Sequence, residues 1–298
     1  MKLNRWRSVW RDLLVRRQNV VGINRRNVEL IYPFNERRHF AIADDKLVAK
    51  EVLTRLGVPV PRLLGVANGL HEVGGLLARI EGEEHFVVKP AQSSGGQGLL
   101  VVGEQVAPGV WIKAGGGRVT LAQIRQHVAN IVFGAFSKDR PDRAYVEERI
   151  QAHPVYQRLW QDGLSDLRII TLRGTPLMAM LRVPTAASGG VANLHQGGIG
   201  LAIDIETGRT VRASFRGRPI ERHPDNGERL IGVEQPEWDK VLDTARRASR
   251  VPLAYLGTDI VVDRDGRTLV LELNARPGLE IQNVNGQGLG TRLMEVLG

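Results

Sequence analysis

One stretch near the carboxyl end, residues 256–278, constrains the fold more than any other part of the chain. It reads LGTDIVVDRDGRTLVLELNARPG. Residues 258–263 and 268–273 are short runs rich in residues that favour strands, and Arg264-Asp265-Gly266-Arg267 lies between them. Glycine supplies the backbone freedom that a tight turn requires. The pattern predicts an antiparallel hairpin.

The register of this hairpin brings two acidic residues together. With a four-residue loop, Asp263 faces Thr268, and the same register places Asp259 opposite Glu272. Asn274 lies two residues beyond Glu272 and points to the same face, because side chains alternate along a strand. The residues expected to point the other way, towards a core, are Leu269, Leu271 and Leu273.

The two facing carboxylates indicate a bound cation. At a separation of about 5 Å and an effective dielectric of about 20, they repel each other by roughly 3 kcal/mol. Oxygen ligands that include two carboxylates suit Mg²⁺ or Mn²⁺ better than Zn²⁺. The alternative is a surface hairpin with solvated acids, but the strand over residues 268–273 is too apolar for a solvated edge. We therefore expect the metal ligands to be Asp259, Glu272 and Asn274.

The composition is that of a globular protein with one or two domains. The chain has 298 residues, of which 42% are hydrophobic and 24% charged. It has no cysteine, which excludes disulfides, thiolate metal sites and a cysteine nucleophile. No apolar run approaches the roughly 18 residues of a membrane span, and no signal peptide follows Met1-Lys2. A soluble cytoplasmic protein is the default expectation.

The formal net charge of +9 implies an anionic partner. Residues 1–43 are the most basic part of the chain. Apolar residues recur there at helical spacing with arginines between them, from Leu3 to Leu14. Such a helix either lies on a membrane or an acidic partner, or packs on the body of the protein with its arginines in water. We favour the second interpretation.

Two lysines are candidates for binding phosphate. Lys46 lies in the first turn of a helix predicted from a cap at Asp44 to about Leu56. The helix dipole disfavours a cation there, so Lys46 either reaches outward for a phosphate or is an ordinary solvated lysine. Lys89 lies near the end of a strand predicted over residues 85–90.

A glycine-rich loop, residues 91–98, follows Lys89 and leads into a second predicted strand, residues 99–102. Its sequence, AQSSGGQG, lets backbone N–H groups approach an oxyanion closely. It lacks the Gly-Lys-Ser/Thr of a Walker A motif and does not open a helix as a Rossmann loop does. The loop is therefore a phosphate-binding candidate that is not specific on its own.

Further polar residues lie on predicted strands and one loop. Glu147-Glu148, on a strand over residues 144–150, are either edge charges or the frame of an adenine and ribose. Arg168 and Arg182 flank a hairpin formed by residues 166–172 and 177–183. His195, in the loop NLHQGG of residues 193–198, is either a general base or a structural histidine, and we favour the structural interpretation. Helices are predicted over residues 120–136, 237–250 and 291–297.

These segments, in this order, resemble the ATP-grasp superfamily and, within it, the ribosomal-protein glutamate ligase branch. Inside that branch the chain is similar to the group called alpha-L-glutamate ligase-like proteins. The resemblance covers roughly residues 20–298. It rests on residues 22–27, VEERI (146–150), Asp166 with Arg168, NLHQGG (193–198) and LELNARPGLE (271–280).

The resemblance implies an α+β fold in which two α+β subdomains with antiparallel sheets clasp ATP. Residues 44–145 would form the first subdomain, with the glycine-rich loop, and residues 146–298 the second, with the metal site. Residues 1–43 are too few for the α/β domain that precedes this core in related ligases. That domain is therefore expected to be reduced or absent.

The resemblance also implies roles for individual residues. Residues implied to bind ATP are Lys46, Lys89, Ser94, Gly95, Gly96, Gly98, an adenine hinge of Glu147, Glu148, Arg149 and Ile150, and Asp166 near the ribose. Those implied to hold two Mg²⁺ or Mn²⁺ ions are Asp259, Glu272 and Asn274. Those implied to surround the transferring phosphate and the bound acid are Arg168, Arg182, Asn193 and Arg276.

The implied activity is that of an ATP-dependent carboxylate–amine ligase that works through an acylphosphate and releases ADP and phosphate. Its partners would be ATP, an amino acid such as glutamate, and a carboxylate-bearing small molecule, peptide or protein; a homo-oligomer stays open. No protein nucleophile is needed, which agrees with the absence of cysteine. One alternative is a kinase on the same scaffold. The other is a non-catalytic basic protein that binds an acidic partner; with 5% aromatic residues and no nucleic-acid motif, specific nucleic-acid binding is not expected.

Overall fold

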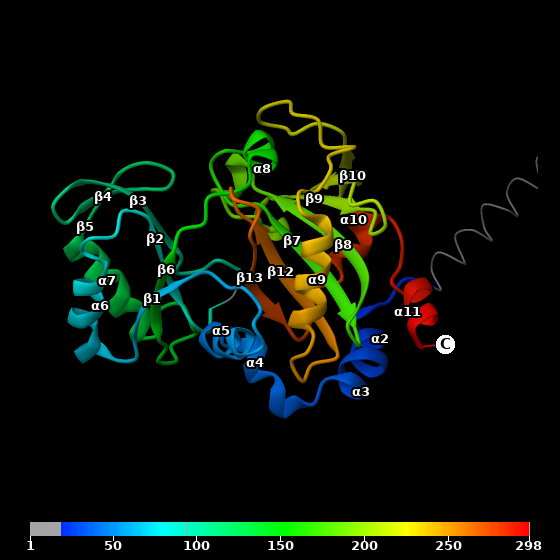
Figure 1. The fold of residues 1–298 in the computed structure, drawn as a ribbon, viewed down its shortest axis with the longest axis horizontal. Coiled ribbons are helices and arrows are strands. Elements are labelled where there is room, and N and C mark those ends of the chain that lie inside the picture. Colours follow the sequence, from blue (N-terminus) through cyan, green and yellow to red (C-terminus); the bar gives the residue numbers. More distant parts are fainter. Residues whose placement is uncertain (1–18, 94, 298) are drawn as a thin grey trace, which may run out of the picture.

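Two antiparallel sheets organise the chain, and they lie side by side in Figure 1. The structure is a computed structural model that describes residues 19–93 and 95–297. The first sheet has the order β1–β6–β2–β3–β4–β5, with strands β1 (Leu63–Ala67), β2 (Phe86–Pro90), β3 (Leu100–Ala107), β4 (Val110–Lys113), β5 (Arg118–Thr120) and β6 (Ala144–Glu148). The arrangement is α+β, as predicted.

The second sheet has seven strands, with β13 at one edge and β12 beside it. Its order is β11–β10–β9–β8–β7–β12–β13, with strands β7 (Asp166–Leu172), β8 (Thr175–Val183), β9 (Ile199–Ile203), β10 (Thr210–Phe215), β11 (Arg218–Ile220), β12 (Tyr255–Val262) and β13 (Thr268–Asn274). The predicted boundary at residue 145 falls inside β6, because the chain leaves the first sheet only after Glu148.

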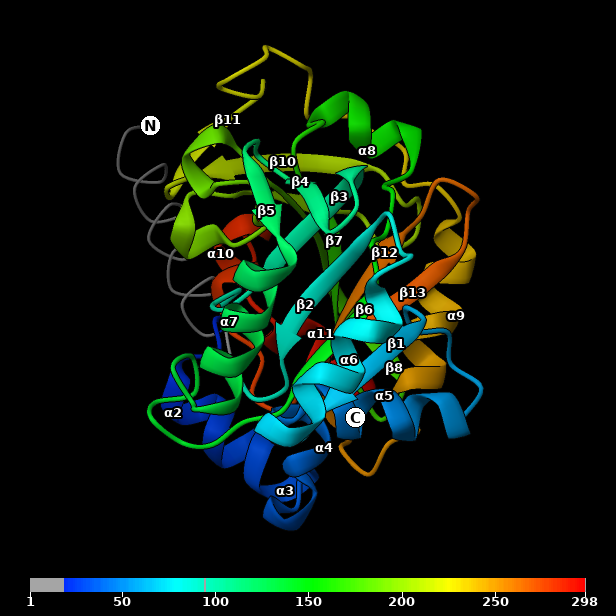
Figure 2. The same ribbon diagram turned by 90° about the vertical axis from the view of Figure 1, so that its left-hand side faces the viewer.

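Two helices, α6 (Val73–Ile80) and α7 (Leu121–Val132), pack on one face of the first sheet (Figure 2). Thr120 begins α7 in a capping box, accepting from the backbone N–H of Gln123, whose side chain accepts from Thr120. Phe86 and Trp111 meet edge to face in the core beneath, with ring centroids 5.8 Å apart. Because side chains alternate along β2, Lys89 lies on the opposite face of the sheet.

The second sheet is buried on both faces. On one side it packs against α8 (Pro154–Leu159) and α9 (Trp238–Ala248), and on the other against α10 (Glu280–Asn285) and α11 (Gly290–Leu297). Leu167 and Ile169 of β7 join the first of these cores, whereas Ile170 and Leu172 join the second. The alternation therefore sends Asp166 and Arg168 to the α10 side of the sheet.

The β12–β13 hairpin pairs Asp259 with Glu272, as the sequence predicts, but by a different register. Val262, not Asp263, faces Thr268, so the loop is one residue longer at that end. A bulge between the Asp259 and Ile260 pairings then restores the predicted opposition. Leu271 is the extra residue of the bulge, and it lines a cavity rather than the core, which corrects the prediction for that side chain.

The described part of the amino-terminal segment is tied to the second sheet. It contains α2 (Ile23–Arg25), a π-helical stretch (Arg26–Ile31), α3 (Tyr32–Phe34) and α4 (Ala41–Asp44). Buried Asn35 donates to the carbonyls of Tyr255 and Ala275 at 2.7 and 2.9 Å, and accepts from Tyr255 N–H. The basic helix expected among residues 1–18 lies outside the described residues.

The helix that carries Lys46 is α5 (Lys46–Arg55), and its cap is Asp45 rather than the predicted Asp44. The Asp45 carboxylate accepts from the N–H groups of Leu47 and Val48, at 3.0 and 3.1 Å. Asp44 instead pairs with Arg276 at 2.8 Å. The α5 helix also packs against β13, so it joins the core of the second sheet.

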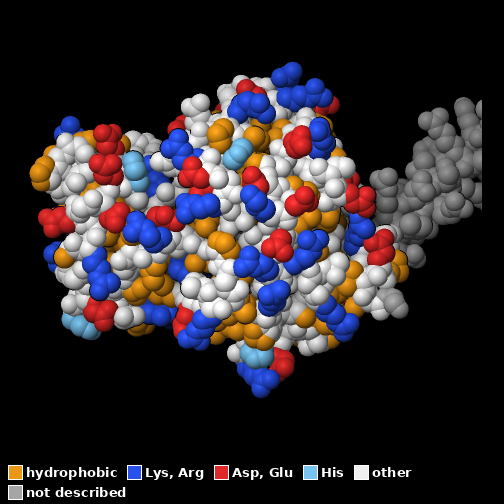
Figure 3. Space-filling model, in the orientation of Figure 1, with side chains coloured by type: hydrophobic (Ala, Val, Ile, Leu, Met, Phe, Trp, Pro, Cys, Tyr) orange, Lys and Arg blue, Asp and Glu red, His pale blue; other side chains and the backbone are white. Residues whose placement is uncertain are grey.

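Charge is spread over the surface rather than gathered in one patch on the face shown in Figure 3, where lysines and arginines alternate with acidic side chains. Among the described residues, no helix has the length and apolarity needed to span a bilayer.

Candidate active site

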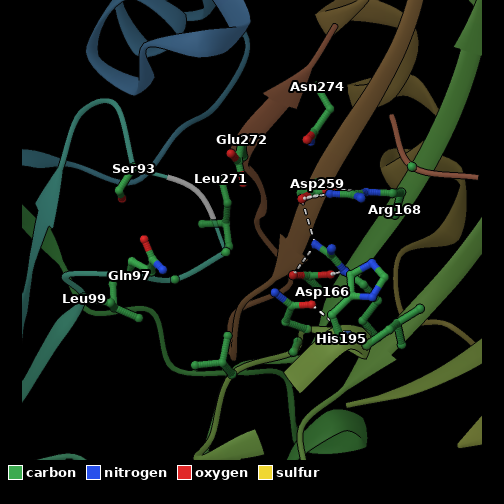
Figure 4. Close-up of a pocket in the computed structure, with 18 of the residues that line it drawn as sticks. Ser93, Gln97, Leu99, Asp166, Arg168, His195, Asp259, Leu271, Glu272 and Asn274 are labelled. Atoms are coloured by element: carbon green, nitrogen blue, oxygen red, sulfur yellow. Dashed lines mark hydrogen bonds and ion pairs between the residues drawn. The ribbon is translucent and has the colours of Figure 1, made fainter. Parts of the chain in front are cut away.

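A cavity of about 410 Å³ lies between the two sheets and collects most of the predicted site residues. Figure 4 shows Glu272 and Asn274 on one strand, Asp259 on its neighbour, and Ser93 and Gln97 across the cavity. The predicted residues that line it are Lys46, Lys89, Gly95, Gly96, Asp166, Arg168, Arg182, Asn193, Asp259, Glu272 and Asn274. Ser94 lies outside the described residues.

Lys46 connects the glycine-rich loop with the metal-ligand candidates. Its Nζ donates to the carbonyl of Ser93 and lies 3.9 Å from Oε1 of Glu272. The backbone N–H of Lys46 donates to the carbonyl of Ala91 at 3.0 Å. The start of α5 is therefore fixed to the loop at two points, and the Lys46 ammonium lies inside the cavity.

Lys89 and Lys50 both pair with the buried carboxylate of Glu147, and the sequence analysis did not identify Lys50. Glu147, 3% exposed, pairs with the Nζ of Lys89 through Oε1 and with the Nζ of Lys50 through Oε2 at 2.9 Å. Burial opposes ionisation of Glu147, but attraction to Lys89 and Lys50 outweighs it and lowers its pKa. The sequence signal for Lys50 is its spacing, one helical turn after Lys46.

The implied adenine hinge does not reach the cavity through its side chains. Glu147 faces the two lysines, and the Glu148 carboxylate accepts from the backbone N–H of Arg62 at 3.0 Å. Neither these residues nor Arg149 and Ile150 line the cavity. A role for the hinge as nucleotide-binding backbone stays a prediction.

Two carboxylates and two guanidinium groups form a buried cluster on β7, β8 and β12. Arg168 donates to both oxygens of Asp259, at 2.7 and 2.6 Å. Arg182 donates to Asp166 at 2.5 and 2.8 Å and to Asp259 at 2.7 Å. Alternation along β7, β8 and β12 places all of these groups on one face of the sheet, where the strand pairings bring them opposite one another.

The two carboxylates of this cluster differ in their tendency to ionise. Burial raises the pKa of Asp259, but its attraction to Arg168 and Arg182 is stronger, so the pKa falls below its usual value. Burial, together with repulsion from Asp259, raises the pKa of Asp166 to about 6 in spite of Arg182. Asp259 is therefore the more readily ionised carboxylate of the cluster.

The residues present suit a divalent ion. Asp259, Glu272 and Asn274 supply oxygen donors from two adjacent strands to one cavity, and Mg²⁺ and Mn²⁺ prefer such donors. The buried amide nitrogen of Asn274 has no hydrogen-bond partner among the described residues, so the protein does not lock this amide in one orientation. In the part of the chain described, no group of three His, Cys, Asp or Glu side chains could hold a metal. A metal site at this position would therefore need the amide oxygen of Asn274 as its third ligand.

The glycine-rich loop touches the second sheet's β8–β9 connection. The Gln196 side chain donates to the carbonyl of Gly95 at 2.7 Å, and a side chain at Gly96 would lie 3.3 Å from Val191. Asn193 caps the short turn Leu194–Gln196 by accepting from His195 N–H at 3.0 Å. The sequence analysis singled out Asn193 and His195 in this loop but not Gln196, whose only signal is its place in NLHQGG.

Arg276 is not brought into the cavity. Its guanidinium donates to both oxygens of Asp44 at 2.8 Å and lies over the ring of Phe40, 5.0 Å from the centroid. It is half exposed. The structure therefore gives Arg276 no direct contact with the site implied for it, whereas Glu280, to which no role was assigned, does line the cavity.

Comparisons with known proteins identify the family of the chain. The family described as sugar-transfer associated ATP-grasp matches residues 25–297. A probable alpha-L-glutamate ligase of Serratia proteamaculans is 27% identical over 276 residues, which cover 91% of this chain and 70% of that protein. The solved structure of biotin carboxylase from Campylobacter jejuni matches with a TM-score of 0.51 and 17% identity, covering 83% of this chain and 43% of that one. The structure of the ATP-grasp ligase PsnB with a minimal precursor matches with a TM-score of 0.45 and 18% identity, and this chain spans 62% of its length.

Proposed function

Because the chain belongs to the sugar-transfer associated ATP-grasp family, we propose that it is an ATP-dependent ligase that joins a carboxylate to an amine and releases ADP and phosphate. The similarity to the Serratia relative, a probable alpha-L-glutamate ligase, supports glutamate as one substrate. The chain spans 70% of the length of that relative. The identity of both substrates is therefore proposed here together with the reaction. We place the reaction in the cytoplasm, where ATP is abundant.

The observation that carries this proposal is the distribution of charge around the cavity. Lys89 lies on β2 of the first sheet and Lys46 at the start of α5 beside the glycine-rich loop, while Asp259 and Glu272 line the cavity from the second sheet. Lysine ammonium groups and bound divalent ions both stabilise the negative charge of triphosphate oxygens. Phosphoryl transfer depends chiefly on positioning and on electrostatic stabilisation, and this cavity offers both.

The chemistry requires two bond exchanges. A substrate carboxylate oxygen forms a bond to the γ-phosphorus as the bond to ADP breaks, which gives an acylphosphate. The amine nitrogen then bonds to the acyl carbon as the carbon–oxygen bond to phosphate breaks, and the nitrogen loses its extra protons to give the amide. No protein nucleophile takes part.

The residues of the cavity divide this work. Lys46, Lys89 and the backbone of the glycine-rich loop bind the phosphates, and Asn193 orients the transferring group. Arg168 and Arg182 keep the buried carboxylate of Asp259 ionised and in place. The metal ligands would be Asp259, Glu272 and Asn274; Mg²⁺ or Mn²⁺ held there, two ions in this proposal, neutralises phosphate charge.

Thermal unfolding tests the nucleotide site. At a hundred times its Kd, a non-hydrolysable ATP analogue with Mg²⁺ should add about 2.7 kcal/mol of stability. For subdomains of this size that is a rise in Tm of roughly 5–10 °C over Mg²⁺ alone. The rise should disappear in Glu272→Ala. No rise at millimolar nucleotide would contradict the proposal.

Turnover assays separate a ligase from a kinase on the same scaffold. In a ligase, release of ADP requires both a carboxylate and an amine, and an amide accumulates in proportion to ADP. A phosphorylated product that accumulates without any amine would assign the protein to the kinases.

A further inference from the structure

Three cavities that share lining residues run from the site described above towards the turn between β10 and β11. The second cavity, about 220 Å³, shares Leu194, His195 and Glu280 with the first. The third, about 410 Å³, shares Ser214, Gly217 and Glu280 with the second. Glu280 thus borders all three cavities.

Two arginines line the outer part of this row. Arg216 borders the second cavity and Arg212 the third, and both are exposed. In residues 19–93 and 95–297, no carboxylate forms an ion pair with either arginine. The Arg212 guanidinium lies against the backbone of Gly286, where a Cβ would come within 2.2 Å of Nη1. The Arg216 guanidinium lies over the ring of Phe215, 5.1 Å from its centroid. Neither positive charge has a counter-ion among the residues that the structure describes.

The order of charges along the row matches a zwitterion. Beyond the metal-ligand carboxylates comes Glu280, which has a hydrogen bond from Asn283 at 2.9 Å, and beyond Glu280 come Arg216 and Arg212. An anion alone would meet the arginines but would be repelled by Glu280. A ligand with an ammonium group on the inner side and a carboxylate on the outer side satisfies both.

We propose that the second and third cavities bind the amine substrate, an α-amino acid or a peptide whose ammonium group lies at Glu280 and whose carboxylate lies at Arg216 and Arg212. This assignment rests on the proposed ligase function and adds the chemical class of the amine and its orientation. The amine end points inward, towards the acyl group that it must attack beside the phosphate site.

Isothermal titration tests the assignment on the full chain loaded with Mg²⁺ and a non-hydrolysable ATP analogue. The probes are the common amino acids, glutamylglutamate, and for each acid that binds, the matching amine without its α-carboxylate. Loss of a charge-assisted hydrogen bond in Arg216→Ala or Arg212→Ala should weaken amino-acid binding by about tenfold or more. The matched control is Arg218→Ala on β11, which lines none of the three cavities and should leave binding within about twofold.

The amine without a carboxylate makes the test specific. It should bind more weakly than its parent acid in the wild-type protein, and Arg216→Ala should not weaken it further. Glu280→Gln should weaken both ligands, because each carries the ammonium group. Equal effects of Arg216→Ala on the two ligands would overturn the proposed orientation.

Nucleotide binding is measured first in every variant, so that the two proposals can fail separately. Absence of nucleotide binding in the wild type refutes the ligase function itself. Nucleotide binding without any amino-acid or dipeptide binding at millimolar concentration refutes only the amine site. Inorganic phosphate that binds as tightly as the best amino acid, and loses affinity in Arg216→Ala, would also overturn it by showing a simple anion site.

Discussion

Asp259 lies directly opposite Glu272 across the β12–β13 pair, yet its carboxylate is held by Arg168 on the other neighbouring strand. Arg168 lies opposite Asp259 in the β7–β12 pairing, and its two hydrogen bonds occupy both carboxylate oxygens. The two acids that the hairpin brings together are therefore not equivalent. Asp259 is 2% exposed and paired, whereas the Glu272 side chain is one-third exposed with Lys46 at 3.9 Å.

This asymmetry predicts different costs for removing the two acids. Asp259→Ala leaves Arg168 and Arg182 without their shared partner and should destabilise the fold by about 3–5 kcal/mol. Glu272→Ala removes one long, partly exposed ion pair and should cost less than about 1 kcal/mol. Urea unfolding measures both.

The same two variants should behave alike in metal-dependent nucleotide binding, which both should lose. Asp259→Asn provides a milder change if Asp259→Ala does not fold. A Glu272→Ala variant that binds Mg²⁺–nucleotide normally would show that Glu272 is not a metal ligand. Equal destabilisation by Asp259→Ala and Glu272→Ala would show that the arginine pairing does not set the stability.

Glu147 is predicted to stabilise the fold in a pH-dependent way. Its ordinary pKa is 4.5 and the folded state lowers it, because attraction to Lys89 and Lys50 exceeds the penalty of burial. A carboxylate with a lowered pKa contributes its full stability above its unfolded pKa and loses it as the pH falls through the folded pKa. The stability advantage of the wild type over Glu147→Gln should therefore be constant near neutral pH and shrink below about pH 4.5.

At neutral pH, Glu147→Gln should itself cost about 3 kcal/mol, because two mostly buried lysines lose their counter-ion. Glu148→Gln is the matched control on the next residue, since the Glu148 carboxylate pairs with no lysine or arginine in the described part of the chain and accepts from the backbone N–H of Arg62. Urea titrations at several pH values measure both effects. If Glu147→Gln and the wild type had the same unfolding free energy at every pH, the proposed role of the lysine pair would be wrong.

The hydrogen bond from Gln196 to Gly95 predicts that the second sheet holds the glycine-rich loop closed over the cavity. One such bond contributes about 1 kcal/mol, so Gln196→Ala should weaken binding of an ATP analogue roughly fivefold. The loop should also become more sensitive to limited proteolysis. Gln157→Ala on the exposed face of α8 is the control. Equal proteolysis of the two variants would show that the hydrogen bond from Gln196 to Gly95 does not hold the loop closed.

Sequence reasoning located the cavity because its ligands come from local patterns. The strands β2, β7, β8, β12 and β13 each carry a polar residue at a position that alternation assigns to one face, and the predicted ranges agree closely with the observed ones. The opposition of Asp259 and Glu272 is correct, but two deviations cancel: the loop is displaced by one residue and a bulge compensates. Alternation alone predicts neither, which is why Leu271 was assigned to the core.

The pairings inside the cavity could not be predicted, because they join residues far apart in the chain. Arg182 and Asp259 are 77 residues apart, and Lys89 and Glu147 are 58 apart. Their contact depends on sheet order, which no local pattern encodes. The predicted cap of α5 was wrong for a different reason, because Asp44 and Asp45 are adjacent and chemically equivalent. The backbone conformation makes Asp45 the cap, while Asp44 pairs with Arg276.

The hydrogen bonds of Asn35 predict that the amino-terminal segment supports the hairpin that carries the proposed metal ligands. Its buried side chain bonds to Tyr255 at the start of β12 and to Ala275, the residue after Asn274. Asn35→Ala leaves these backbone groups buried without partners, and we expect a loss of about 3 kcal/mol in unfolding free energy. Asn68→Ala, which removes only an exposed bond to Glu72, should cost less than about 1 kcal/mol.

Nucleotide binding by Asn35→Ala distinguishes a role in positioning Asn274 from a role in stabilising the fold alone. Because Ala275 follows Asn274 directly, loss of its anchor should let the amide move and weaken Mg²⁺-dependent nucleotide binding at temperatures where Asn35→Ala is fully folded. Fluorescence titration of an ATP analogue with Mg²⁺, and with nucleotide alone, measures this. Weakened binding with Mg²⁺ but not without it would place the effect at Asn274. Unchanged binding in both titrations would mean that the amino-terminal segment stabilises the sheet without positioning the ligand.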